Sequence, residues 1–230
     1  MVPRSVFQQS LPVLITSLVN KSGSIGLSLL PILLVEGHYS TSESSLVMSC
    51  VKGTTIFATL ASGWMSDSLG LRTTIQASLL VAALGLAFVP VQGGIFLLLV
   101  AGVLAQLGIT SVNGTMRLLL AQTVERQAQK EALGWMRFVN NLGQVLSFGL
   151  ATMTATFGAK ILIWFDALTS FVALLIGNRI LPRSRKGLHS PGPLTGARTS
   201  GSGAAVSSWW PFIGCTLLLA GWTFFYEFFM

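Results

Sequence analysis

Polar side chains inside otherwise apolar segments are the residues of this sequence best suited to bind a solute. Asn20 and Lys21 lie near the middle of residues 11–35, and Ser24 follows about one helical turn later. A lysine in the middle of a membrane-spanning helix costs about 2.5–3.5 kcal/mol on insertion scales, so we expect it to face a cavity or a partner. A role as a solute ligand or proton site is preferred, and a purely structural buried cation is the alternative.

A second polar group lies in residues 132–157. Asn140 and Gln144 are four residues apart, so they share one face of a helix. Two amides on one face are too polar to point at lipid. They are expected to line the same cavity, and hydrogen bonding between helices alone is the alternative.

Asp166 is the acidic residue best placed for proton coupling. It is the only carboxylate well inside any of the apolar segments before residue 182. Acidic residues at such a depth commonly belong to proton relays. Asp166 is therefore the leading candidate if protons are the coupling ion.

The elements that must position these residues are long apolar runs. The chain has 230 residues, of which 52% are hydrophobic and 9% are charged, against about 25% charged in a typical soluble domain. This composition excludes a soluble globular domain, a disordered chain and a disulfide-rich module. Because a helix needs about 20 apolar residues to cross a bilayer, the sequence predicts an all-α polytopic membrane protein. The predicted spans are 11–35, 44–66, 74–91, 94–121, 132–157, 161–181 and 209–230.

The spans fall into two groups. Residues 1–181 are expected to form a six-helix bundle, and residues 182–208 read as a cytoplasmic linker rich in Pro, Gly and Ser. The span at 209–230 would then begin a truncated second bundle. Placing the N-terminus in the cytoplasm leaves only Lys160 in an outer loop. It puts nine basic residues inside, as the positive-inside rule requires: Arg4, Arg72, Arg126, Lys130, Arg179, Arg183, Arg185, Lys186 and Arg198.

A motif connects the second and third predicted spans, with Gly63, Asp67, Gly70 and Arg72 in the spacing G-x-x-x-D-x-x-G-x-R. Gly63 would allow close helix contact, and Gly70 would permit a tight turn. Asp67 can accept hydrogen bonds at the membrane edge. The spacing resembles the cytoplasmic signature of the major facilitator superfamily, in which this loop docks against the second bundle and controls opening. The resemblance therefore implies that these four residues form a gating motif.

Two further stretches resemble the same family in part. Residues 121–134 are similar at both ends to the family's next cytoplasmic loop, but Gln122 replaces its acid, which leaves Glu125 as the nearest substitute partner for Arg72. Gly134 and Gly143 resemble the start of the family's antiporter motif. We expect a structural and gating charge cluster, with snorkelling to the headgroups as the alternative. Its members would be Asp67, Arg72, Arg117, Glu125 and Arg137.

The resemblance implies a secondary active transporter that moves a small solute by alternating access. An efflux permease in a bacterial inner membrane is one such form, with protons as a coupling ion. The alternatives are a non-transporting fragment, a half-transporter subunit or a scaffold, because the C-terminal bundle is almost wholly missing. His38 and His189 both lie in loops, and no hydrolase or phosphate-binding motif is present. No enzyme activity, cofactor, metal site or nucleic-acid partner is therefore expected.

Overall fold

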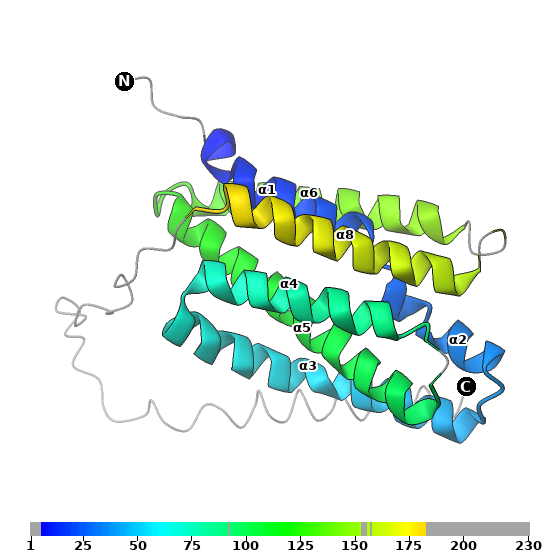
Figure 1. Cartoon of the computed structure of the whole chain (residues 1–230). Helices are drawn as coiled ribbons and strands as arrows, with labels where there is room; N and C mark the ends of the chain where they lie inside the picture. The colour runs from blue at the N-terminus through cyan, green and yellow to red at the C-terminus, as the bar shows by residue number, and fades with distance from the viewer. Residues whose placement is uncertain (1–5, 92, 153–155, 157, 183–230) are drawn as a thin grey trace, which may run out of the picture. The chain divides into compact units, whose positions relative to one another are not determined.

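A computed structural model describes residues 6–91, 93–152, 156 and 158–182 of the chain. The described residues all belong to one compact unit, which lies within Met1–His189. Every regular element among them is a helix (Figure 1), which confirms the all-α class. The predicted seventh span, 209–230, and all of the predicted linker after residue 182 lie outside the described residues.

Six segments of this unit correspond to the six predicted spans. Their ends agree with the predicted ends within a few residues, except that the first span is interrupted and that residues 153–155 and 157 are not described. The elements are α1 (Val6–Ser22), the short 3-10 helix η1 (Gly26–Ser28), α2 (Leu30–Glu36), α3 (Thr41–Leu69), α4 (Leu71–Phe88), α5 (Ile95–Thr123), α6 (Gln129–Ala151) and α8 (Ala159–Ile180).

Five of these segments are long and apolar enough to cross a membrane among the residues that the structure describes. They are Val6–Glu36, Thr41–Leu69, Leu71–Phe88, Ile95–Thr123 and Ala159–Ile180. The helix α6 forms where the fifth crossing was predicted and has 23 residues, so it is roughly 35 Å long. Its lower apolarity has a local cause, because its first half carries charged residues and its middle carries the amides Asn140, Asn141 and Gln144.

The turn between α3 and α4 explains one glycine of the sequence motif. Gly70 has φ +88° and ends α3, a backbone conformation that residues with a Cβ rarely adopt. The predicted tight turn at Gly70 is therefore present. Gly63 behaves differently, because a Cβ built there meets no atom within 4 Å among the described residues. The prediction that Gly63 mediates a close helix contact is therefore wrong for this part of the chain.

A close helix contact lies between α4 and α5, which run side by side in Figure 1. A Cβ at Gly85 would lie 2.3 Å from the backbone nitrogen of Ala105. A Cβ at Gly108 would lie 2.4 Å from that of Ala82. Small residues on both helices thus allow their backbones to touch, which is how helices associate when lipid removes the hydrophobic drive between them.

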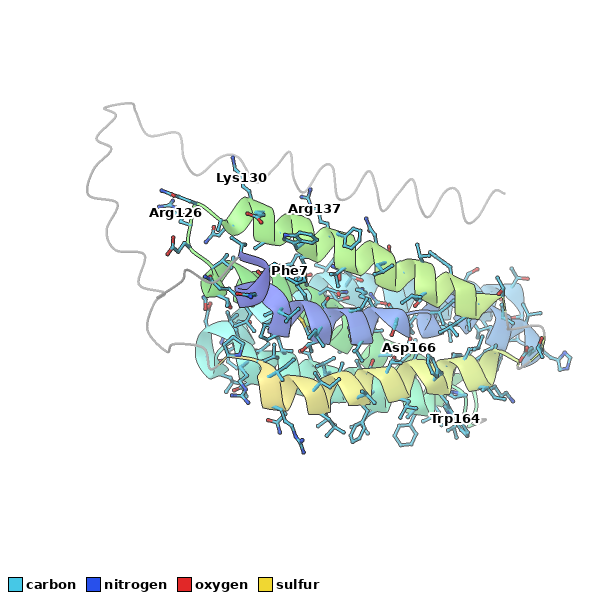
Figure 2. All side chains as sticks on the ribbon, turned by 90° about the horizontal axis from the view of Figure 1, so that it is seen from above. Phe7, Arg126, Lys130, Arg137, Trp164 and Asp166 are labelled. Carbon is cyan, nitrogen blue, oxygen red and sulfur yellow. The ribbon has the colours of Figure 1, made fainter. Side chains whose placement is uncertain are left out.

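The helix ends with basic residues gather at one end of this unit. The start of α1, the α3–α4 turn, the α5–α6 loop and the end of α8 all lie there in Figure 1. Arg126 and Lys130 are at that end in Figure 2, whereas Trp164 and Asp166 lie toward the other. The basic residues in these end segments are Arg72, Arg126, Lys130 and Arg179. This arrangement agrees with the charge asymmetry from which the orientation was predicted.

Candidate functional site

The first membrane segment is broken in its middle, directly after Lys21. The helix α1 ends at Ser22 and η1 begins at Gly26. Between them, the backbone N–H of Ser24 donates to the carbonyl of Lys21 at 3.2 Å. This bond spans three residues instead of the four of a regular α-helix. A break of this kind leaves backbone groups without helical partners. In a membrane such groups must be satisfied by neighbouring protein.

On the α1 side of the break, Ser147 of α6 donates to the last two carbonyls of the helix. Its hydroxyl lies 2.8 Å from the carbonyl oxygen of Lys21 and 3.0 Å from that of Ser22, and shares its proton between them. Gly143 makes this approach possible, since a Cβ there would lie 2.5 Å from the Cβ of Lys21. The small residues of α6 therefore hold the broken end of α1.

On the other side of the break, Asp166 of α8 satisfies a freed amide. Its carboxylate accepts a hydrogen bond from the backbone N–H of Gly26 at 2.8 Å, and the residue is only 2% exposed. A Cβ at Gly26 would lie 2.7 Å from the same carboxylate oxygen, so the contact depends on glycine. The charges of Asp166 and Lys21 also interact. The proposed coupling carboxylate therefore forms part of the helix break, and its titration during transport stays a prediction.

A cavity of about 290 Å³ adjoins this break between α1, α5 and α6. It is lined by three cationic residues and four amides, namely Lys21, Arg117, Arg137, Asn113, Asn140, Asn141 and Gln144. Lys21 is half-buried, whereas Arg117 and Arg137 are exposed, and Arg137 extends outward from α6 (Figure 2). The positive charges of Lys21 and Arg117 are close enough to repel each other. No carboxylate is among the lining residues.

Three of the five predicted cavity residues line this cavity. They are Lys21, Asn140 and Gln144. Asn140 also accepts a hydrogen bond from Ser17 of α1 at 2.8 Å, so it lines the cavity and joins two helices at once.

The other two predicted cavity residues lie beside the cavity. Asn20 is 5% exposed, and its amide oxygen accepts a hydrogen bond from Ser170 of α8 at 3.3 Å. Ser24 is half-buried in the broken segment itself. Asn20 therefore connects α1 to α8, and neither residue is among those that line the cavity.

The predicted charge cluster is divided by the structure. Arg117 and Arg137 line the cavity, whereas Arg72 donates to the backbone carbonyl of Asn178 at the end of α8. Asp67 and Glu125 are exposed, and no ion pair joins any of the five within the described ranges. The reason is geometric, because Arg117 lies six residues, or about 9 Å, before the end of α5 and cannot reach the loop groups easily.

Two contacts were missed by the sequence reasoning. Asn178 accepts from Arg72 through its backbone and from Gln76 through its side chain at 3.0 Å, which attaches the α3–α4 turn to α8. Asn113 lines the cavity. A signal for Asn113 was available, since it precedes Arg117 by four residues and therefore shares its helix face. Asn178 had no such signal, because its partners are remote in sequence.

Comparison with known proteins identifies the family of this chain. Residues 13–230 match the family model described as Major Facilitator Superfamily. The chain belongs to the major facilitator superfamily. It is therefore a multi-pass membrane protein, and the resemblance of its sequence motifs to those of this family is confirmed.

The fold of this superfamily member is similar to that of a solved transporter. The match is to the inward open conformation of the xylose transporter XylE from E. coli, with a TM-score of 0.63 and 12% sequence identity. The match covers 78% of this chain and 48% of that chain, so the present chain spans about half the length of XylE. No curated protein sequence matches the chain. At 12% identity the likeness shows a shared fold.

Proposed function

We propose that the chain is the N-terminal part of a secondary active transporter that moves a small solute by alternating access. The observation that carries this proposal is the polar cavity beside the broken first segment. In an apolar bundle, ionisable groups and interrupted helices are costly and usually surround a substrate pathway. Family membership supports the same conclusion.

Within this proposal the described residues have separate roles. Lys21, Asn140 and Gln144 contact the solute, and Asn20 and Ser24 support them. The gating motif works through the α3–α4 turn, where Gly70 sets the turn and Arg72 attaches it to α8. Asp166 is the proposed coupling carboxylate, because protonation would weaken its hold on the Gly26 amide and so release the broken segment.

The distribution of charge supports an orientation in the membrane. Basic residues gather at the end that holds the α3–α4 turn and the α5–α6 loop, so that end faces the cytoplasm under the positive-inside rule. We assign the protein to a bacterial inner membrane, with efflux as the direction of transport.

The decisive experiment is Lys21→Ala in the complete polypeptide that carries this chain. Flux of a panel of radiolabelled small solutes into proteoliposomes should be lost, while membrane insertion and yield stay unchanged. Lys130→Ala is the matched control, since Lys130 is exposed and lies outside the cavity. Normal flux in Lys21→Ala would refute the cavity assignment.

One alternative is favoured by a specific observation. The match to XylE covers only 48% of that chain, so the present chain could serve as a half-transporter that requires a second bundle. Light scattering of the purified chain would separate the two proposals. A stable dimer that supports flux favours the half-transporter, and a monomer without flux favours a part of a longer transporter.

A further inference from the structure

The charge balance of the cavity points to the class of solute, an inference that rests on the proposed transport function. Three cationic side chains line about 290 Å³, and the lining includes no carboxylate. The nearest buried acid, Asp166, is held by the Gly26 amide on the far side of the α1 break. The lining therefore carries a net positive charge, of which Asp166 offsets only a part, at Lys21. A net positive charge beside a membrane-spanning bundle favours an anionic partner, most strongly at the half-buried Lys21.

The two arginines lie within their helices, more than a turn from the helix ends. Arg117 is about 9 Å before the end of α5, and Arg137 is about 12 Å after the start of α6. A guanidinium is always charged and presents paired donors that match a carboxylate or a phosphate. With Lys21 at the inner wall, the three groups surround one volume from three helices.

The amides limit what else the solute can be. Asn113, Asn140, Asn141 and Gln144 present both donors and acceptors to the cavity. They suit hydroxyl or carbonyl groups on the same molecule. The volume of about 290 Å³ suits a small solute.

We infer that the cavity of Lys21, Arg117 and Arg137 takes a small organic anion, a hydroxylated carboxylate or phosphate ester, as the transported solute. The phosphate of an anionic lipid headgroup offers part of the same chemistry. The free anion is the better match, because the four amides provide hydrogen bonds beyond what a phosphodiester needs.

The test measures the thermal unfolding midpoint of the purified chain in neutral detergent. Malate, glycerol 3-phosphate and inorganic phosphate are the anionic probes, and glucose and choline are the neutral and cationic ones, all at one ionic strength set with sodium chloride. Binding to the folded state raises the midpoint. Malate or glycerol 3-phosphate should raise it, whereas glucose and choline should not.

The variants Arg117→Gln and Arg137→Gln should each weaken anion binding by about tenfold or more, since a charged hydrogen bond is lost. Lys130→Gln on α6 is the matched control and should bind as the parent chain does. Both arginines are exposed, so these variants should fold. Parent-like binding in both variants would overturn the inference, as would stabilisation by glucose or choline or no shift with any anion.

Two further measurements are needed. One distinguishes a lipid headgroup from a soluble anion as the ligand, and the other tests the anion site and the transport function separately. Stabilisation by phosphatidylglycerol in nanodiscs, without stabilisation by soluble anions in phosphatidylcholine, would assign the cavity to a lipid headgroup and refute the inference. Anion binding to the complete polypeptide that carries this chain, without flux in proteoliposomes, would uphold the anion site and refute the transport proposal. Flux of glucose but not of malate or glycerol 3-phosphate would uphold transport and refute the anion site.

Discussion

Two helix pairs in this protein achieve close contact in different ways. Between α4 and α5, Gly85 and Gly108 place backbone directly on backbone. Between α1 and α6, Gly143 also gives close approach, but the contact is accompanied by hydrogen bonds from Ser17 to Asn140 and from Ser147 to the carbonyls beside Lys21. The first pair is apolar at its closest points. The second pair is polar and adjoins the cavity.

This difference indicates which of the two helix contacts is expected to change during a transport cycle. Van der Waals packing of small residues has no alternative partner in lipid, so the α4–α5 contact is expected to persist through a transport cycle. Hydrogen bonds at a broken helix can be exchanged for bonds to water or solute. The α1–α6 contact is therefore the place where opening and solute binding can be coupled.

The largest expected effect is at the rigid pair. Leucine in Gly108→Leu would force side-chain atoms into the backbone of α4, because even a Cβ would lie 2.4 Å from the nitrogen of Ala82. Overpacking typically costs about 1–3 kcal/mol, and more where only backbone can yield. We expect loss of the monodisperse peak in size-exclusion chromatography.

The matched control for that variant is Gly114→Leu on the same helix, where a Cβ would meet nothing within 4 Å among the described residues. Its elution profile should be that of the parent chain. Equal behaviour of the two leucine variants would show that α4 and α5 are not closely packed.

An intermediate effect is expected at the helix break. Asp166→Leu leaves the buried N–H of Gly26 without its acceptor, which costs about 1–3 kcal/mol. Asp166→Asn keeps an acceptor oxygen and should lose less. Thermal unfolding should rank the midpoints as parent, then asparagine, then leucine. A leucine variant as stable as the parent chain would show that Asp166 does not hold the break.

The smallest effect is expected at Ser147→Ala, which removes one shared hydroxyl proton from the carbonyls of Lys21 and Ser22. The expected loss is about 0.5–1.5 kcal/mol in the free energy of unfolding. Ser68→Ala is the control, since its exposed hydroxyl bonds only within α3. If both alanine variants unfold at the same temperature, the hydroxyl of Ser147 does not stabilise the break.

The interrupted first segment shows where sequence reasoning stopped. Apolarity predicted one continuous span at 11–35, yet the helix stops at Ser22 and resumes as η1 at Gly26. Gly23 and Gly26 are weak local signals for such a break. Hydropathy averages over them, so the break was missed although the polar residues around it were identified.

The charge cluster shows a different limit. The sequence placed Arg117 and Arg137 in the same cluster as Asp67, whereas the structure puts them at the cavity, six residues before the end of α5 and eight after the start of α6. The position of a residue along its helix can be counted from the sequence. The residues that it contacts depend on how each helix is rotated about its axis, and only the packing of the helices sets that rotation.

The sequence alone determined the membrane class, the positions of the six segments in residues 1–181, the Gly70 turn and the polar residues that must avoid lipid. These properties are local, because the transfer of each side chain from water to lipid contributes almost independently of distant residues. Tertiary structure alone decided that Ser147 meets the carbonyl of Lys21, 126 residues away, and that Asp166 meets the amide of Gly26, 140 residues away. Such pairs depend on how glycine-lined surfaces of separate helices fit together, and no local property of either residue records that fit.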